Sequence, residues 1–253
     1  VLANLVMRMD DEAAGGGDLL RTPKISNITA SAKAANTQVT LNAPTEDAFT
    51  LNINRHFESS YLVEDRLSTQ AAYKVLNEYS PKAGYAVSKQ MDSDIASLYS
   101  GLSQFVGNST TDITDDNIRR GLQYLDDADA PQVDRYFVIK PAGLNHLRGI
   151  AKFVQYDSLG ISPAVPAAGG GLTNGNSVVR RIGPNGFVGV LYGTLEVYMS
   201  TNLTEESGTS DTVHNLLFQK EAFALAVQKA VRMQFQYKLE YLGNLATADA
   251  IWG

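Results

Sequence analysis

The chain has 253 residues, 44% of them hydrophobic, a formal net charge of −6 and no cysteine. Its length and apolar content are enough for a hydrophobic core in one large domain or in two closely joined ones. The negative net charge argues against a nucleic-acid-binding groove. The lack of cysteine excludes disulfides and thiolate metal sites. No apolar run approaches the roughly 20 residues that span a bilayer.

The N-terminal region is predicted to be an arm followed by a thin β-ribbon. Residues 1–12 form the arm, and the glycines at 15–17 close it. Further along, apolar and polar residues alternate with period 2 in two segments, 38–42 and 49–57, which a turn at 43–47 joins. The large apolar side chains of the two segments are Val39, Leu41, Phe49, Leu51, Ile53 and Phe57.

This ribbon is too thin to bury itself. A two-stranded ribbon is marginally stable in water, and so few large side chains cannot make a core. We therefore expect the six apolar residues to contact a neighbouring subunit. Phe49, Ile53 and Phe57 are expected to be covered by that neighbour, so that Ile53→Asp blocks assembly and leaves the subunit folded.

Four helices are predicted in the middle of the chain. The first follows Ser68, and the second begins at Ser80–Pro81, with serine as the N-cap and proline in the first turn. An apolar stripe makes this second helix about 25 residues long and favours packing on a sheet over a coiled coil. Thr114 caps a third helix, 114–125, and Pro141 opens a short fourth one.

Strands are predicted on both sides of a glycine-rich loop. Tyr136–Ile139 precedes the loop at 160–176, and a hairpin-rich block at 187–199 follows it. The run from Met233 to Tyr241 alternates apolar and polar residues, as a half-exposed strand does. Helices and strands together, without a repeat at solenoid spacing, predict an α+β fold.

No catalytic, cofactor-binding or metal-ligating residues are predicted. The three histidines, His56, His146 and His214, are far apart, and none has a metal partner at helical spacing. No serine lies in a Gly-x-Ser-x-Gly elbow, and no phosphate loop is present. The carboxylate cluster Asp126–Asp129 has the oxygen ligands of a hard cation, but it lacks the glycine and the distal glutamate of a calcium loop. Solvated surface charge is the favoured interpretation of that cluster.

The order of the predicted parts resembles that of a known family. A short arm, a long extended loop, a long helix, a helix–strand–helix unit, a glycine-punctuated strand block and terminal strands follow one another, as in the major capsid proteins of tailed bacteriophages. These have the Hong-Kong-ninety-seven-type fold, which encapsulins and herpesvirus capsid floors share. The segments with local resemblance are Phe57–Gln70, Tyr85–Asp94, Leu125–Pro131, Arg135–Ala142, Gly189–Gly193, Val197–Thr201 and Phe218–Ala226.

The resemblance covers the chain from Asp18 to Gly253 and implies a structural subunit of an icosahedral head. It implies hexamers and pentamers that enclose double-stranded DNA, with portal, scaffolding and decoration proteins as partners. The virion head is the implied location, after assembly in the host bacterial cytoplasm. The implied parts are an N-terminal arm at 1–17, an extended loop at 18–60, a peripheral domain with a spine helix at 61–111 and 218–253, and an axial domain at 112–217.

The sequence alone is also compatible with two other classes of protein. An encapsulin-like compartment has the same kind of shell but stores an enzyme cargo, which would purify with it. An enzyme with an unrecognised site needs titratable residues that converge in a pocket. The long extended loop and the terminal strands favour the phage capsid.

Overall fold

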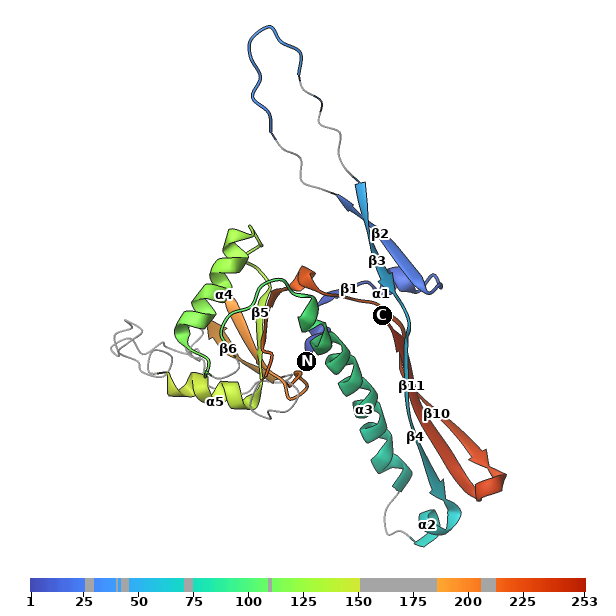
Figure 1. The fold of residues 1–253 in the computed structure, drawn as a ribbon. Helices are drawn as coiled ribbons and strands as arrows, with labels where there is room; N and C mark the ends of the chain where they lie inside the picture. Colours follow the sequence, from blue (N-terminus) through green and yellow to red (C-terminus); the bar gives the residue numbers. More distant parts are fainter. Residues whose placement is uncertain are drawn as a thin grey trace, which may run out of the picture. The chain divides into compact units, whose positions relative to one another are not determined.

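The computed structural model of the chain describes residues 1–25, 30–39, 41, 46–70, 75–108, 111–150, 186–205 and 213–253. The chain divides into two compact units, whose elements are labelled in Figure 1. The first unit comprises Val1–Met7 with Pro81–Ala224, and the second comprises Arg8–Ser80 with Leu225–Gly253. Both contain helices and strands, so the predicted α+β class is confirmed. The predicted loop at 160–176 lies outside the described residues.

A four-stranded sheet forms the centre of the first unit. Its strands are β5 (Arg135–Ile139), β6 (Phe187–Leu191), β7 (Leu195–Met199) and β8 (Leu216–Gln219). They lie in the order β6-β7-β5-β8, with β5 parallel to β7 and the other neighbours antiparallel. The predicted strand at 136–139 and the predicted hairpin block at 187–199 are both confirmed.

Two helices pack against one face of this sheet. α4 (Asp115–Asp127) contributes Ile118 and α5 (Pro141–Gly149) contributes Leu144 and Leu147 to a common core. The buried strand residues of that core are Phe137, Ile139, Val188, Leu191, Leu195 and Val197. Because successive strand residues point to opposite faces, their neighbours Tyr136 and Tyr198 lie on the other face of the sheet.

The starts of both helices follow from local sequence. The Thr114 hydroxyl accepts a hydrogen bond from the Asn117 amide at 3.3 Å, which is the predicted N-cap. Asp115 and Asp116 in the first turn suit the positive end of the helix dipole. Pro141 occupies the first turn of α5, where its missing N–H costs no hydrogen bond.

A buried carboxylate fixes the N-terminal segment within the first unit. Asp92, on the long helix α3 (Val75–Ser97), is buried and pairs with the α-amino group of Val1 at 2.6 Å. It also accepts hydrogen bonds from the Ala3 amide at 3.0 Å and from the Asn202 side-chain amide at 3.4 Å. These three partners offset the free-energy cost of burying the charge.

α3 is the predicted long helix, but it does not begin at Pro81. Pro81 lies inside it, where the missing N–H leaves the carbonyl of residue 77 without its helical donor. Contacts from outside the helix stabilise the turn before the proline. The Tyr61 and Tyr79 rings lie 5.6 Å apart between centroids, and the Tyr61 and Ser80 hydroxyl oxygens are 2.8 Å apart. Such contacts between distant segments are not visible in the local sequence.

The second unit is built on an antiparallel three-stranded sheet in the order β10-β11-β4. Its strands are β4 (Arg55–Glu64), β10 (Val227–Lys238) and β11 (Gly243–Trp252). On its apolar face, Ala246, Ala248 and Ala250 of the central strand are fully buried. Trp252 stacks on Phe57 on the same face, with ring centroids 5.2 Å apart.

The ribbon is present, but its strands pair differently from the prediction. β2 (Leu19–Ile25) pairs with β3 (Glu46–Asn52), and the described residues of 38–42 are not in a strand. The predicted strand 49–57 is broken at Ile53–Asn54, after which β4 begins and pairs with β11. The alternation of apolar and polar residues continues across that break, so periodicity alone could not reveal it.

The remaining described elements are short. They are β1 (Met7–Arg8), which pairs with β9 (Ala224–Leu225), α1 (Asp10–Ala13), α2 (Asp65–Gln70), and 3-10 turns at Leu2–Asn4, Leu98–Gly101, Lys220–Ala222 and Leu239–Tyr241. The predicted helix cap at Ser68 is wrong, because α2 begins at Asp65, whose carboxylate suits a helix N-terminus. None of the helices in the described ranges is long and apolar enough to cross a membrane.

Candidate assembly surfaces

The segment between β2 and β3 is exposed wherever the structure describes it, at residues 30–39 and 41. Leu41 is 85% exposed, and Val39 is exposed as well. On β3 the Phe49 side chain is 42% exposed. These three apolar side chains are free to be covered by another molecule, and their contact with a neighbouring subunit stays a prediction.

The other three residues of the predicted contact lie against the second unit's own residues. Leu51 and Ile53 are only 9% and 8% exposed, and the Ile53 amide donates a hydrogen bond to the Asp18 carbonyl at 2.8 Å. Phe57 is half-buried in its stack on Trp252. The expectation that the ribbon buries none of its apolar residues within the subunit is therefore wrong for Leu51 and Ile53. Both residues lie where the ribbon joins the rest of the second unit, so other residues of that unit cover them.

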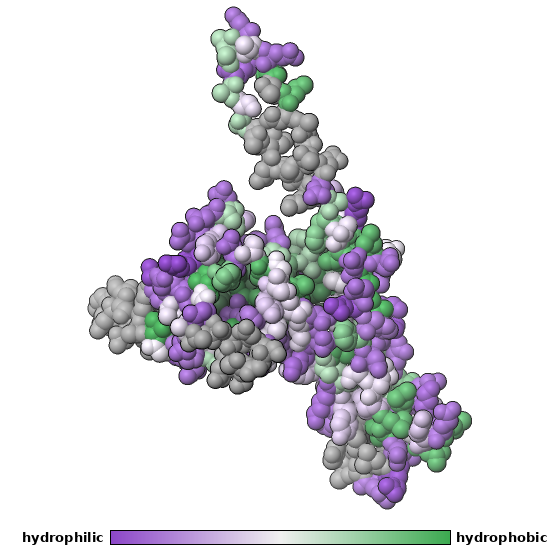
Figure 2. All heavy atoms as spheres, viewed as in Figure 1, coloured by the Kyte–Doolittle hydropathy of each residue, from purple (hydrophilic) through white to green (hydrophobic). Residues whose placement is uncertain are grey.

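An apolar tip closes the hairpin of β10 and β11. We call Leu239, Tyr241 and Leu242 the hairpin tip; all three are exposed, Leu239 by 78%. In Figure 2 apolar spheres gather over this turn, at the lower right. Solvated turns favour Gly, Asn, Asp and Ser, so exposed leucines at a turn indicate a contact surface. The sequence interpretation extended the strand to Tyr241 and missed the tip, although the run Leu239–Gly243 was visible.

The apolar face of β10 continues this surface. β10 is an edge strand of its sheet, and Phe235 is exposed although it lies opposite the buried Ala246. The Tyr237 hydroxyl donates a hydrogen bond to the Asp65 carboxylate at 2.7 Å, which raises the pKa of the tyrosine. The sheet therefore presents aromatic side chains along its edge as well as at the hairpin tip.

The opposite face of the same sheet is charged. Arg232 donates two hydrogen bonds to the Asp249 carboxylate, at 2.8 and 2.9 Å, and these hold the pKa of that carboxyl below its usual value. His56 lies 3.6 Å from Asp249, on the polar face where it was predicted. This face therefore combines paired charges with some exposed apolar surface, since Leu62, opposite Leu245, lies on the same side and is 37% exposed.

The structure does not bring the three histidines together. His56 is beside Asp249, His146 lies 3.2 Å from the Asp112 carboxylate, and the His214 ring stacks on Tyr99 with centroids 3.9 Å apart. Across the described ranges, no group of three or more His, Cys, Asp or Glu side chains is placed to hold a metal ion.

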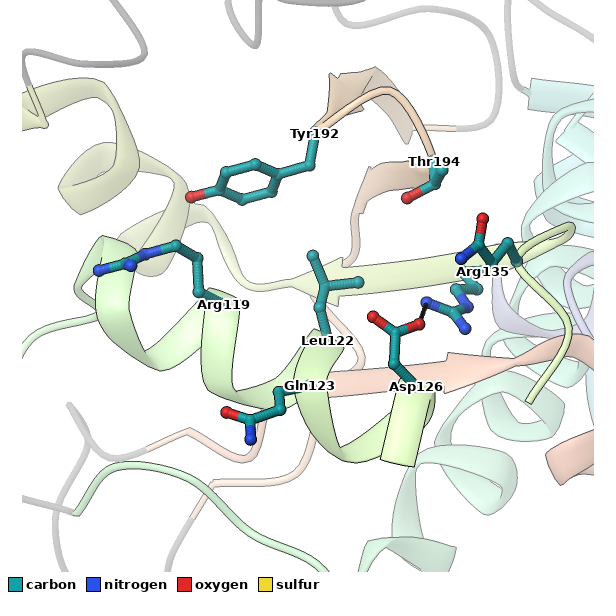
Figure 3. A pocket seen from close by; sticks show the side chains of 8 residues that line it. Arg119, Leu122, Gln123, Asp126, Arg135, Tyr192 and Thr194 are labelled. Atoms are coloured by element: carbon teal, nitrogen blue, oxygen red, sulfur yellow. Dashed lines mark ion pairs between the residues drawn. The ribbon is translucent and has the colours of Figure 1, made fainter. Parts of the chain in front are cut away.

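A hollow of about 340 Å³ lies beside α4 in the first unit (Figure 3). Its lining residues are Arg119, Leu122, Gln123, Asp126, Gln132, Arg135, Tyr192 and Thr194. Figure 3 shows Asp126 and Arg135 joined by an ion pair across it. Arg119 pairs with Asp115 and Asp116 at 3.1 and 3.2 Å. Arg119, Asp126 and Arg135, the charged residues that line the hollow, are thus all in ion pairs.

Arg135 explains part of the carboxylate cluster at Asp126–Asp129. Its side chain is 2% exposed and donates hydrogen bonds to the Pro131 carbonyl at 2.9 Å and the Ala130 carbonyl at 2.7 Å. It also pairs with Asp126 at 2.7 Å. Asp126 therefore serves as an ion-pair partner that ties the end of α4 to the start of β5.

Replacing this arginine is expected to destabilise the first unit. Arg135→Met keeps a long apolar side chain but removes the donors for two carbonyls and for Asp126, which should lower the free energy of unfolding by about 2–4 kcal/mol. Urea denaturation followed by circular dichroism measures the change. Arg120→Met is the matched control, because Arg120 is exposed and, among the residues that the structure describes, pairs with Asp116 alone; it should shift stability by less than about 0.5 kcal/mol. Equal effects of the two variants would contradict the role given to Arg135.

The face of the four-stranded sheet opposite α4 and α5 carries clustered rings. We call Tyr136, Phe187 and Tyr198 the aromatic face; all three are half-buried. Ring centroids are 5.4 Å apart for Phe187 and Tyr198 and 5.9 Å apart for Tyr136 and Tyr198, with edge-to-face geometry. The Tyr198 hydroxyl donates a hydrogen bond to the Glu196 carboxylate at 3.0 Å. The sequence interpretation did not identify this cluster, since its members come from three strands.

This environment predicts a change of stability at high pH. Burial, followed by the hydrogen bond to Glu196, raises the pKa of Tyr198 to about 12 from its ordinary value of 10.0. The folded state keeps the phenol protonated where the unfolded state loses the proton, so this stabilisation is full below pH 10 and is lost as the pH rises toward 12. The melting temperature of the wild type should fall more steeply over that window than that of Tyr198→Phe. If the melting temperatures of the two proteins fall in parallel as the pH rises, the raised pKa of Tyr198 is contradicted.

The fold of the chain is similar to that of phage capsid structures. Against Mycobacterium phage Che8 the TM-score is 0.75 at 22% identity, covering 100% of this chain and 86% of that chain. The capsid of Cyanophage P-SCSP1u gives 0.69 at 16% identity, covering 100% and 83%, and the capsid of Ralstonia phage GP4 gives 0.65 at 12%, covering 98% and 82%. No protein-family model and no curated protein matches the chain. The predicted phage capsid-type fold is confirmed.

Proposed function

We propose that this chain is a structural subunit of an icosahedral bacteriophage head. In this proposal, copies of the chain assemble into hexamers and pentamers that close around the DNA genome. The fold supports it, because the similar structures include the capsids of two phages and the likeness extends over nearly the whole chain. The four parts predicted from the sequence, arm, extended loop, peripheral domain and axial domain, belong to the same proposal.

The exposed segment between β2 and β3 is the observation that carries the proposal. It places Val39 and Leu41 in solvent, and the hairpin tip adds two exposed leucines. Fully covering one leucine or valine contributes roughly 1.5–3 kcal/mol. Surfaces of this kind favour association with other molecules over a solvated monomer. Contacts that repeat around a rotation axis then give closed rings of subunits.

The charge of the chain fits a shell that encloses DNA without gripping it. With a formal net charge of −6, the subunit lacks the excess of lysine and arginine that tight phosphate binding needs. We further propose that the chain is not an enzyme and needs no cofactor. Portal and scaffolding proteins, with a decoration protein on the outside, are the proposed partners, and the virion head, assembled in the host bacterial cytoplasm, is the proposed location.

The direct test is assembly of the purified chain. Size-exclusion chromatography with light scattering and electron microscopy, at rising concentration and with a scaffolding protein, should show capsomers or shells. A stable monomer under all these conditions would overturn the proposal. Shells that purify with an enzyme inside them, and not with DNA and a portal, would indicate a cargo compartment instead.

A further inference from the structure

The aromatic face of the first unit carries two carboxylates. Glu196 lies beside Tyr136 in the parallel register of β5 and β7, and it accepts the Tyr198 hydrogen bond. Asp134, just before β5, is exposed, and its negative charge helps to raise the pKa of Tyr136, after the larger effect of burial. Within the part of the chain that the structure describes, neither carboxylate forms an ion pair with a lysine, arginine or histidine.

This combination of groups attracts a cation. The faces of aromatic rings are electron-rich and bind an ammonium or guanidinium group, more strongly where the site is partly desolvated. Two carboxylates beside the rings add a direct electrostatic attraction. The same negative charge opposes ionisation of the phenols: burial is the larger cause of the raised pKa of Tyr136, and the charges of Asp134 and Glu196 raise it further.

We propose that the aromatic face binds the guanidinium group of an arginine from an adjacent copy of this chain, and that Arg148 is that arginine. The proposal rests on the function proposed above. A planar guanidinium stacks on rings and donates to carboxylates in a fixed geometry, which suits this site better than a lysine ammonium.

The position of Arg148 in the fold fits this role. Arg148 is exposed in the last turn of α5, and α5 packs against the face of the sheet opposite the aromatic face. Head-to-tail contacts around a rotation axis join two different surfaces of the same unit. The arginine and its binding site therefore lie on two such surfaces. Arg119 and Arg120 of α4 are less suited, because both already pair with aspartates of their own helix.

A charge exchange tests the contact. Glu196→Gln keeps the size of the side chain and a hydrogen-bond acceptor but removes the charge, so capsomer formation should weaken by about tenfold. Glu196→Arg and Arg148→Glu should each weaken it at least as much, and the double variant should restore it to within about threefold of the wild type. Glu221→Gln removes the same charge from an exposed site and should change nothing. Wild-type assembly of Glu196→Gln, or no restoration in the double variant, would overturn the proposal.

A small probe separates this inference from the proposed function. N-acetyl-arginine amide added to the unassembled wild-type chain should shift the ring resonances of Tyr136, Phe187 and Tyr198 in a saturable way. The uncharged isostere N-acetyl-citrulline amide should not, and Glu196→Gln should weaken the arginine response by about tenfold. If the wild type forms no oligomers at all, the proposed function fails while this titration still measures the site. Equal shifts with both ligands would overturn the binding site itself.

Discussion

Ile53→Asp is expected to unfold the second unit of the subunit. Ile53 is 8% exposed, and the backbone around it is crowded, since a Cβ on Gly253 would come within 2.8 Å of the Ile53 Cα and 2.2 Å of the Asn52 carbonyl oxygen. The carboxylate would lose the apolar contacts of isoleucine and would place an unpaired charge among packed atoms. A loss of about 4–5 kcal/mol is the expected size of such a change.

The only tryptophan of the chain reports this unfolding. Trp252 is buried in the second unit and stacks on Phe57, so its fluorescence should follow the loss of that unit in urea. Phe49→Asp is the matched control on the same ribbon, because Phe49 is 42% exposed. It should change the free energy of unfolding by less than about 1 kcal/mol while weakening assembly. A folded Ile53→Asp subunit that fails only in assembly would restore the expectation drawn from the ribbon's pattern alone.

Ile53 also shows where sequence reasoning stops. Alternation identified the apolar side chains of the ribbon, but it could not tell a side chain covered by its own subunit from one left for a neighbour. That distinction depends on the pairing of β2 with β3 and of β4 with β11, whose partners are far apart in the sequence. When two segments both alternate apolar and polar residues, the local sequence does not show which of them a distant strand pairs with, or in which register.

Features with local causes were predicted well. The cap at Thr114 and the proline that opens α5 depend on a few adjacent residues, and the structure has both. The helix start at Pro81 was predicted wrongly, because α3 extends before the proline. Its first turns are stabilised by Tyr61, which belongs to strand β4 and is distant in the sequence. The aromatic face was missed for the same reason, because three strands contribute its rings.

The hairpin tip should be necessary for assembly and unimportant for folding. Leu239 is 78% exposed, so Leu239→Asp removes almost no contact within the subunit and should change its stability by no more than about 0.5 kcal/mol. If a neighbouring molecule covers the leucine in the shell, the variant loses roughly 2 kcal/mol at each such contact, which corresponds to about a thirtyfold weaker contact. In the proposed shell every subunit repeats the loss, so shells of the variant should be absent at concentrations where the wild type is expected to assemble.

A matched variant separates the lost apolar contact from the added charge. Gln236→Asp introduces the same charge at an exposed position of β10 but removes no apolar side chain, so it should assemble at nearly the wild-type concentration. Light scattering across a dilution series gives the assembly threshold of each protein, and thermal unfolding of the unassembled subunits gives their stability. Equal thresholds for Leu239→Asp and the wild type would show that the tip stays in solvent in the assembled shell. A raised threshold together with unchanged unfolding would place the tip at a contact between copies, because no loss of folding could account for it.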